Sequence, residues 1–207
     1  MIVIVDYGVG NLFSLSSSFR AIGFPAVISS DKNEILNADR IVLPGVGAFC
    51  DAAEKLKSSG LDLAVKQAAK DGTPILGVCL GMQLLFDISY EYGEYKGLGL
   101  ISGEIRPIAD YIDTDLKIPH IGWNKLRIIK KHPLLKYTAE NDHAYFVHSY
   151  CAVNCGENVI ADAEYGADIT AAVAKANVMG CQFHPEKSGA AGLNILKAFC
   201  ELKRGDL

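Results

Sequence analysis

The first half of the chain alternates short apolar runs with longer stretches whose apolar residues recur at helical spacing. Ile2 to Val5, Ala26 to Ser29 and Arg40 to Leu43 are β-rich and predict strands, and the first of them is expected to be buried. Asn11 to Ile22, closed by Gly23, predicts a helix after the first run, and a short acidic helix is expected before the third. This βαβαβ order predicts a parallel sheet covered on both faces.

The same alternation leads to a cysteine at the end of a predicted strand. A helical stretch from Ala52 to Lys70 is followed by the turn signal Asp71-Gly72. A strand is then predicted from Pro74 to Val78 and a helix from Leu80 to Phe86. Cys79 therefore lies at the carboxyl end of a strand, where open α/β sheets place their ligands.

The second half changes character, because β-prone runs follow one another without long helices between them. These runs are Gly103 to Ile108, Asn124 to Ile129, Ala144 to Tyr150, Asn158 to Tyr165, Ile169 to Ala174 and Val178 to Phe183. A closing helix is predicted from Gly189 to Leu202. We expect an α/β fold with an open, mostly parallel, flavodoxin-like central sheet and a mixed or antiparallel extension.

Composition narrows the class of protein. A length of 207 residues with 50% hydrophobic content suits one domain over residues 1–207, and no repeat or linker-like stretch divides it. The net charge is −4 and no basic run exceeds Lys130-Lys131, so nucleic acid and anionic membranes are not expected partners. The apolar start at Ile2 to Val5 ends at Asp6, too soon for a signal segment or a membrane span.

Six cysteines lack the density of a disulfide framework and fit a reducing cytoplasm. Cys151 and Cys155 form the one close pair, and without a second pair or a nearby histidine they are expected to be ordinary strand and turn residues. Cys181 lies in an apolar run and is expected in the core. We expect neither a metal site nor a cofactor.

Cys79 has the strongest chemical signal. Gly77 and Gly81 flank it at two residues on either side, and glycines there permit the sharp strand-to-helix turn that exposes a nucleophile above a sheet. A thiol reacts as its thiolate and needs a neighbouring base. Taken alone, however, a cysteine is more often a small buried hydrophobe.

A base and a carboxylate stand together far along the chain. His184 and Glu186 are two residues apart, and Pro185 favours an extended residue before it, so both side chains can lie on one side of the backbone. A lone histidine before proline is more often a turn residue. Together with Cys79, the pair predicts a Cys-His-Glu triad in which Glu186 orients His184.

Six strings spread over essentially the whole chain resemble the class I, or triad, glutamine amidotransferases. They are Asp6-Tyr7-Gly8-Val9-Gly10-Asn11, Leu43-Pro44-Gly45-Val46-Gly47, the elbow from Gly77 to Gly81, Pro119-His120-Ile121-Gly122-Trp123-Asn124, Phe146-Val147-His148-Ser149-Tyr150 and His184-Pro185-Glu186-Lys187-Ser188. Many amidotransferases share the elbow and the His-Pro-Glu string. The second and fourth strings are similar to one subgroup, the glutaminase subunits of imidazole glycerol phosphate synthases.

The resemblance implies hydrolysis of glutamine to glutamate and ammonia. In this reading Cys79 attacks the side-chain amide, and His184 protonates the ammonia and then activates water. Backbone N–H groups of Leu80 and of Val46 or Gly47 would form the oxyanion hole. The glycines beside Val46 let that peptide rotate, which suggests an allosterically switched hole, although a simple tight turn is the alternative.

The resemblance also assigns binding and docking residues. Gln83 and Glu91 are implied for the amino and carboxylate end of glutamine, with Ser149 and Tyr150 acting through backbone groups, although Glu91 could equally lie in a solvated loop. A separate (βα)8-barrel cyclase subunit is the implied heterodimer partner, which would receive ammonia and make imidazole glycerol phosphate and AICAR in histidine biosynthesis. The resemblance implies three docking residues at that interface: Asn11, Trp123 and Lys187. A buried core position is the alternative for Trp123.

Other functions stay open at this point. A paralogous amidotransferase subunit could feed ammonia to a sugar-modifying system for surface polysaccharide. A catalytically idle regulatory module is a different class, and the intact triad argues against it. A cysteine peptidase or another thiol protein would share the elbow but not the string from Pro119 to Asn124.

Overall fold

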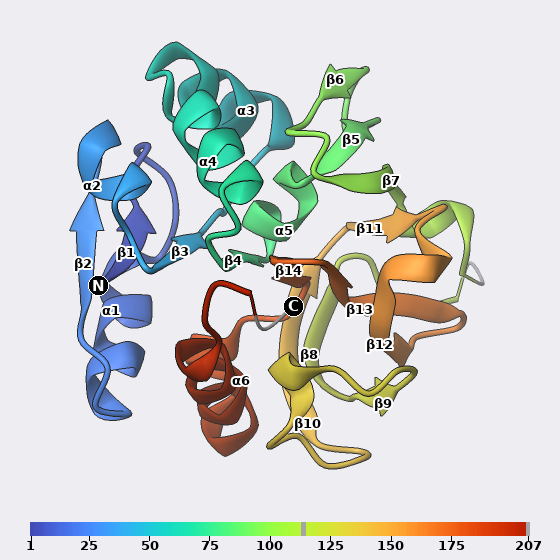
Figure 1. The fold of residues 1–207 in the computed structure, drawn as a ribbon. Helices are drawn as coiled ribbons and strands as arrows, with labels where there is room; N and C mark the ends of the chain where they lie inside the picture. The colour runs from blue at the N-terminus through green and yellow to red at the C-terminus, as the bar shows by residue number, and fades with distance from the viewer. Residues whose placement is uncertain (113–114, 206–207) are drawn as a thin grey trace.

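The computed structural model describes residues 1–112 and 115–205 (Figure 1). An eight-stranded sheet with strand order β2-β1-β3-β4-β14-β13-β12-β9 runs through the molecule. Its first five strands are parallel, and the neighbours from β14 to β9 are antiparallel. The predicted change of character between the two halves of the chain is confirmed.

The parallel half follows the predicted alternation closely. Its strands are β1 (Ile2–Val5), β2 (Ala26–Ser29), β3 (Arg40–Leu43) and β4 (Ile75–Val78). Its helices are α1 (Leu12–Ala21), α2 (Lys32–Leu36), α3 (Phe49–Ser58), α4 (Leu61–Lys70) and α5 (Leu80–Leu84). β14 (Val178–Cys181) pairs in parallel with β4, so the segment after β14 reaches the same sheet edge as the segment after β4.

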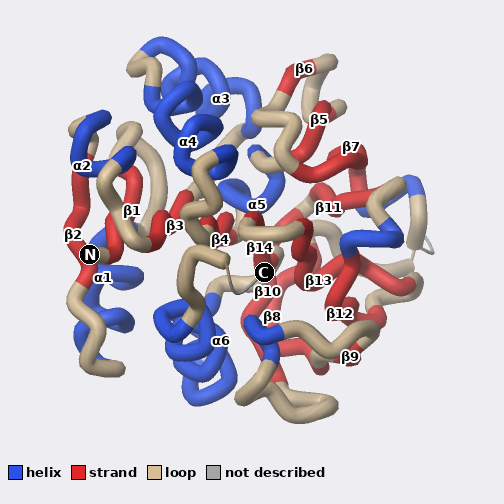
Figure 2. Tube along the Cα trace, viewed as in Figure 1, coloured by secondary structure: helices blue, strands red, loops and turns tan. Residues whose placement is uncertain are grey.

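Helices cover the central sheet on both faces, as Figures 1 and 2 show. One hydrophobic cluster joins Val3 and Val5 to side chains of α2, α3, α4 and α5. A second joins Ile2 and Ile4 to side chains of α1 and of the closing helix α6 (Gly189–Glu201). Alternate residues of β1 thus enter opposite cores, which is why the strand is apolar at every position.

The antiparallel part adds two smaller sheets. β10 (His143–His148) pairs with β8 (His120–Lys125), and a four-stranded sheet has the order β11-β7-β5-β6. The remaining strands are β5 (Phe86–Ser89), β6 (Tyr95–Lys96), β7 (Ile101–Pro107), β9 (Arg127–Ile128), β11 (Tyr150–Val153), β12 (Val159–Glu164) and β13 (Asp168–Lys175). Short 3-10 turns are η1 (Ile108–Asp110), η2 (Pro133–Leu135), η3 (Gly156–Asn158) and η4 (Pro185–Lys187).

Four sequence expectations about the elements were wrong. The run from Asn124 to Ile129 is divided at Leu126 between β8 and β9, which belong to different sheets. The stretch from Ala52 to Lys70 is two helices, because Gly60 adopts φ +69 and breaks it. The helix expected up to Phe86 ends at Leu84, since Phe86 begins β5. The run from Ala144 to Tyr150 is divided at Ser149 into two strands that belong to different sheets.

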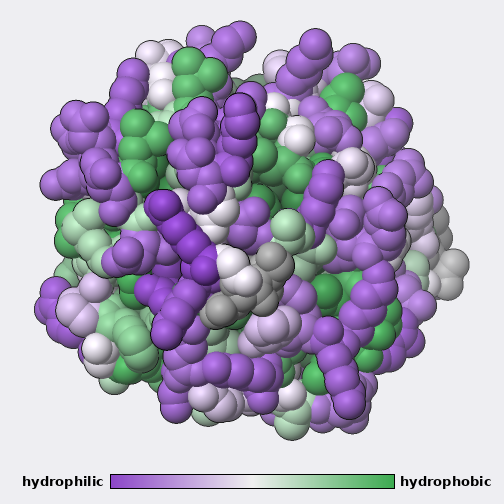
Figure 3. All heavy atoms as spheres, viewed as in Figure 1, coloured by the Kyte–Doolittle hydropathy of each residue, from purple (hydrophilic) through white to green (hydrophobic). Residues whose placement is uncertain are grey.

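The cysteines lie where the sequence predicts them. Cys151 is in β11, Cys155 follows it in a turn, and Cys181 is buried in β14. The visible face is largely hydrophilic, with scattered apolar patches (Figure 3). None of the described helices has the length and apolar character needed to cross a membrane.

Candidate active site

Cys79 occupies a strained position between β4 and α5. Its backbone has φ 53 and ψ −113, outside the regions that non-glycine residues ordinarily adopt. Its N–H donates to the carbonyl of Cys181, and its carbonyl accepts from the N–H of Gln83. Such strain persists only where the surroundings over-determine the conformation, and it is concentrated at functional sites.

Tight backbone contacts explain both flanking glycines. A Cβ on Gly77 would stand 2.7 Å from the carbonyl oxygen of Gly81, and a Cβ on Gly81 would stand 1.9 Å from that of Leu43. Gly45 is equally confined, because its Cβ would lie 2.7 Å from the nitrogen of Gly81. The elbow is therefore wedged between β3, β4 and α5 by close approach that only glycine allows.

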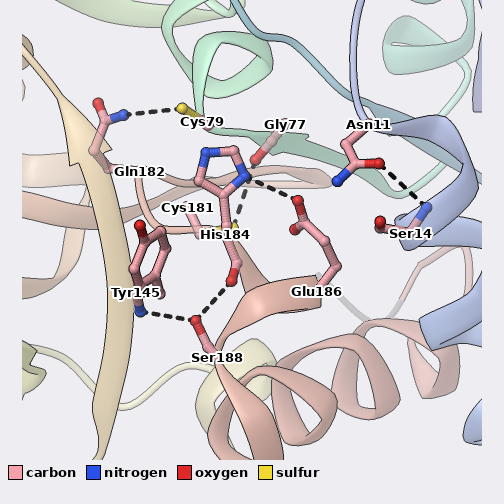
Figure 4. A network of polar contacts seen from close by, with 10 residues as sticks. All are labelled: Asn11, Ser14, Gly77, Cys79, Tyr145, Cys181, Gln182, His184, Glu186 and Ser188. Atoms are coloured by element: carbon pink, nitrogen blue, oxygen red, sulfur yellow. Dashed lines mark hydrogen bonds and ion pairs between the residues drawn. The ribbon is translucent and has the colours of Figure 1, made fainter. Parts of the chain in front are cut away.

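His184 and Glu186 follow β14 and lie beside the elbow (Figure 4). The Nδ1–H of His184 donates to Oε1 of Glu186 at 2.9 Å, and both side chains are almost fully buried. Oε2 of Glu186 is buried without a hydrogen-bond partner among the described residues. The Glu186 carboxylate is therefore directed at the His184 imidazole. The other ring nitrogen of His184, Nε2, faces Cys79 (Figure 4).

Backbone hydrogen bonds hold His184 against β10. Its N–H donates to the carbonyl of Tyr145 at 2.9 Å. The hydroxyl of Ser188 accepts from the N–H of Tyr145 at 2.9 Å and donates to the carbonyl of His184 at 2.6 Å. The position of the imidazole is thus set by a neighbouring strand as well as by Glu186.

The electrostatics of the site favour a charged imidazole. Burial alone would lower the pKa of His184, but hydrogen bonds and charge interactions with Cys79 and Glu186 outweigh it and raise the pKa to about 9. At neutral pH the imidazolium can therefore stand beside the sulfur. This is the arrangement that supports a reactive thiolate and a proton donor for a leaving group.

A pocket of about 310 Å³ opens over Cys79 and His184. The four residues predicted to bind glutamine all line this pocket: Gln83, Glu91, Ser149 and Tyr150. Gln83 is buried, and its Nε2 donates to the Tyr150 carbonyl. That carbonyl also accepts from His148, so it is already saturated.

Glu91 is buried, so the solvated-loop alternative is wrong. Its Oε2 accepts from the N–H of Phe49 at 2.6 Å, at the start of α3, which has no side-chain cap of its own. Burial raises the pKa of Glu91, and the N–H of Phe49 opposes that shift. The carboxylate thus joins the pocket to the helix that follows the loop of residues 44–47.

The candidate oxyanion groups surround the same pocket. Leu80 is the first residue of α5, so its N–H has no partner within that helix. Val46 and Gly47 line the pocket as well. Gly47 adopts φ +94, while Gly45 is wedged against α5. The loop is anchored at one end and carries a glycine conformation at the other.

The three predicted docking residues lie near the site. Trp123 is 56% exposed, so the core alternative is wrong, and it meets Tyr145 edge to face at 5.9 Å. The exposed Lys187 places Nζ 5.7 Å from the centre of the same Tyr145 ring. Asn11 caps α1 by accepting from Ser14, on the Glu186 side of the site (Figure 4).

Sequence reasoning gave no role to a buried polar network behind the nucleophile. Gln182 donates from Nε2 to Sγ of Cys79 at 3.8 Å, and His148 and His120 form a ring pair at 3.1 Å. The signal for Gln182 was available, since a residue two before His184 in an extended segment shares its side. The histidine pair joins two distant strings and had no local signal.

Comparisons with known proteins agree with this geometry. The family model for glutamine amidotransferase class-I matches residues 3–202. Proteins named imidazole glycerol phosphate synthase subunit HisH are similar over nearly their whole length. The one from Lactococcus lactis is 50% identical, covering 97% of this chain and 98% of that protein. The one from Wolinella succinogenes is 48% identical, covering 98% and 100%.

Solved structures are similar in fold at low sequence identity. A glutamine amidotransferase crystal structure has a TM-score of 0.75 at 18% identity and covers 97% of this chain and 100% of that one. PurLQS from Thermotoga maritima has a TM-score of 0.73 at 20% identity and covers 96% of each chain. With the family model and the curated relatives, these comparisons show that the chain belongs to the class I glutamine amidotransferases.

Proposed function

We propose that this chain is the glutaminase subunit of an imidazole glycerol phosphate synthase. It hydrolyses glutamine at Cys79 and delivers ammonia to a separate cyclase subunit in histidine biosynthesis. The observation that carries the proposal is the meeting in one pocket of the strained Cys79 and His184, whose imidazole is held by Glu186. The full-length similarity to HisH subunits supports the choice of pathway.

The reaction follows from the arrangement of the three side chains. The Cys79 thiolate attacks the amide carbon of glutamine, and the oxyanion develops toward the N–H groups of Leu80 and of Val46 or Gly47. His184 gives its proton to the departing ammonia, which leaves a γ-glutamyl thioester. Water deprotonated by His184 then releases glutamate and the thiolate, while Glu186 keeps the imidazole oriented.

The lining of the pocket supports glutamine as the substrate. The Nε2 of Gln83 is occupied by the Tyr150 carbonyl and by Gln182, so its Oε1 is left to accept from the substrate α-amino group. Glu91 adds negative charge for the same ammonium. Because the Tyr150 carbonyl is saturated, the backbone of Tyr150 can contribute to binding only through its N–H.

A partner subunit docked over the pocket would keep ammonia away from water. The exposed Trp123 and Lys187 both contact the half-buried Tyr145 ring beside His184, and aromatic residues are frequent anchors of interfaces. We propose that the partner is the (βα)8-barrel cyclase, that the heterodimer is cytoplasmic, and that docking switches the loop of residues 44–47.

Replacing Cys79 by alanine tests the function. With the cyclase from the same organism, Cys79→Ala should abolish glutamine-dependent synthesis and leave ammonia-dependent synthesis intact. Cys50→Ala, on α3, is the matched control and should retain both activities. Unchanged use of glutamine by Cys79→Ala would overturn the proposal.

Genetic complementation separates this pathway from surface-polysaccharide amidotransfer. The chain and its cyclase together should restore growth without histidine to a strain that lacks both subunits. Growth should be lost when the chain carries Cys79→Ala and ammonia is scarce. Failure of the wild-type pair, with both proteins present and soluble, would favour the sugar-modifying alternative.

A further inference from the structure

Gln182 is a fully buried amide that contacts the nucleophile directly. It follows β14, is 0% exposed, and lies beside Cys79 in Figure 4. Its Nε2 donates to Sγ of Cys79 at 3.8 Å, within the range of hydrogen bonds to sulfur. Its Oε1 accepts from Nε2 of Gln83 at 3.0 Å. Both ends of the amide are thus engaged, one by the reacting sulfur.

The direction of this amide is dictated by one backbone carbonyl. The carbonyl of Tyr150 can only accept, so Nε2 of Gln83 must face it, at 3.2 Å. The second hydrogen on that nitrogen points to Oε1 of Gln182. Gln182 can therefore present only its NH₂ group to Cys79, because a flipped amide would face the Gln83 donor with a donor.

The same carbonyl accepts a second hydrogen bond from His148, which in turn contacts His120, and both histidines are buried. Nδ1 of His148 donates to it at 2.8 Å, so Nε2 of a neutral His148 must accept, which it does from Nδ1 of His120 at 3.1 Å. Nε2 of His120 then accepts from Asn124 at 3.3 Å. Burial lowers the pKa of His120 to about 4 and that of His148 to about 3, so both rings are neutral at pH 7.

Every donor in this chain of contacts therefore meets an acceptor, from Asn124 on β8 to the sulfur of Cys79. A thiolate has no proton to donate, and an N–H aimed at it from a buried, fixed group stabilises the negative charge. Gln182 supplies that N–H without a charge of its own. It also restrains the sulfur from a second direction, while His184 donates and accepts the protons of the reaction.

We propose that Gln182 is a further catalytic residue, which stabilises the Cys79 thiolate before attack and again as the thioester breaks. His148 is a positioning residue, which keeps the Tyr150 carbonyl in place and so fixes the amide direction through Gln83. The catalytic part of this inference rests on the proposed glutaminase function. The contact with sulfur does not, because thiolate reactivity is measurable without glutamine.

Gln182→Glu replaces the donor to sulfur with an ionisable carboxyl oxygen, and the neutral Gln182→Leu, which removes the donor without adding a charge, should shift the alkylation midpoint in the same direction. The glutamate keeps the acceptor for Gln83 but replaces the N–H facing Cys79 with an oxygen. We expect the pH midpoint of Cys79 alkylation by iodoacetamide to rise by about one to two units, and kcat to fall about tenfold to a hundredfold with little change in KM. Gln67→Glu, the same change on the surface of α4, should match wild type.

Two substitutions of His148 test whether its hydrogen bond to the Tyr150 carbonyl fixes the direction of the Gln182 amide. His148→Leu removes the donor to the Tyr150 carbonyl and should shift the alkylation midpoint in the same direction by a smaller amount. His148→Asn can place an N–H where Nδ1 stood and should restore much of the wild-type profile. The other titratable groups that interact with Cys79, namely Tyr7, Cys181 and His184, are unchanged in all these variants.

NMR of the unsubstituted Gln182 side chain keeps the inference testable if Gln182→Glu fails to fold. The side-chain amide proton resonance of Gln182 should move upfield in Cys79→Ala, because the sulfur acceptor is gone. A resonance that stays in place, or a Gln182→Glu protein with the wild-type alkylation profile, would overturn the inference. If alkylation shifts as expected but the wild-type complex does not use glutamine, the proposed function fails while the contact with sulfur stands.

Discussion

The two halves of the sheet place their reacting groups by different physical means. In the parallel half, Cys79 is positioned by backbone packing at Gly77 and Gly81, where no side chain fits. At the boundary with the antiparallel half, after β14, His184 is positioned by hydrogen bonds to Tyr145, Glu186 and Ser188. Substitutions in the first half should therefore damage fold and activity together, whereas in the second they should damage activity with less effect on the fold.

Loss of charge at Glu186 should have the largest effect and should fall on activity alone. Glu186→Gln keeps the shape but removes the charge that helps to raise the pKa of His184 to about 9. We expect glutaminase kcat to fall about 10³-fold, or about 4 kcal/mol in the barrier, in a steady-state assay with the partner.

The melting temperature should separate that effect from unfolding. Glu186→Gln should melt within a few degrees of wild type, because the side chain still fills its site. Glu94→Gln, at an exposed position, is the control for loss of a carboxylate and should keep full activity. A Glu186→Gln protein that is both inactive and strongly destabilised would blur the contrast between the two halves.

Gly81→Ala is the corresponding test of the parallel half. The new Cβ would meet the Leu43 carbonyl oxygen at 1.9 Å, so the backbone of β3 or α5 must move. We expect the free energy of unfolding to fall by about 3 kcal/mol or more, measured by urea denaturation, together with loss of activity.

An unencumbered glycine gives the matched control for that substitution. Gly156 lies in η3 with open space around its Cβ position, so Gly156→Ala should change stability by no more than about 0.5 kcal/mol. A Gly81→Ala protein as stable as wild type would show that the elbow is not held by close packing.

Ser188→Ala should have an intermediate effect. The hydroxyl serves the N–H of Tyr145 and the carbonyl of His184, and both lose a partner when it is removed. We expect a loss of about 1–2 kcal/mol in unfolding free energy and a fall of about tenfold in kcat. Ser58→Ala on the exposed face of α3 should change neither; a Ser188→Ala enzyme with wild-type kcat would show that Glu186 alone positions the imidazole.

The smallest effect concerns the pH dependence of stability. Because burial lowers the pKa of His120 to about 4, the folded state binds fewer protons than the unfolded state below about pH 6.5, so stability falls as pH falls from there toward 4. His120→Phe, at a position stacked between Phe146 and Tyr165, should reduce the loss of stability between pH 7 and 6 by about 0.7 kcal/mol. Urea midpoints at both pH values measure it, and the exposed His143→Phe should retain the wild-type difference.

Local patterns predicted the parts of the fold that depend on local physics. Short β-rich runs identified β1, β2 and β3 at their observed bounds, because each run is set off from the helical stretches beside it. β1 is buried at every position, whereas Val27 and Ile28 are exposed because β2 is an edge strand. The break at Gly60 and the division at Ser149 were missed. At both positions the element ends where its neighbours begin to pack in a different helix or sheet. Hydrophobic periodicity carries no information about that packing.

The candidate site divides in the same way. The spacing of Gly77, Cys79 and Gly81, and of His184 and Glu186, pointed to elbow and base because those pairings are close in the chain and sterically constrained. Gln182 lies two residues before His184, but its sequence position predicted no role for it, because a side-chain amide is not itself a reactive group. Its role emerges from the sulfur that it faces.

The sequence by itself determined the identity of the reacting groups, the α/β class and the resemblance to glutamine amidotransferases, since these depend on residue type and short spacing. Tertiary structure alone decided how β4 and β14 pair, and hence that Cys79 meets His184 across 104 intervening positions of the chain. It also decided that Trp123 is exposed and that His120, His148 and Gln83 converge behind the nucleophile. Long-range pairing sums many weak contacts over the whole core, so no single stretch of sequence encodes it.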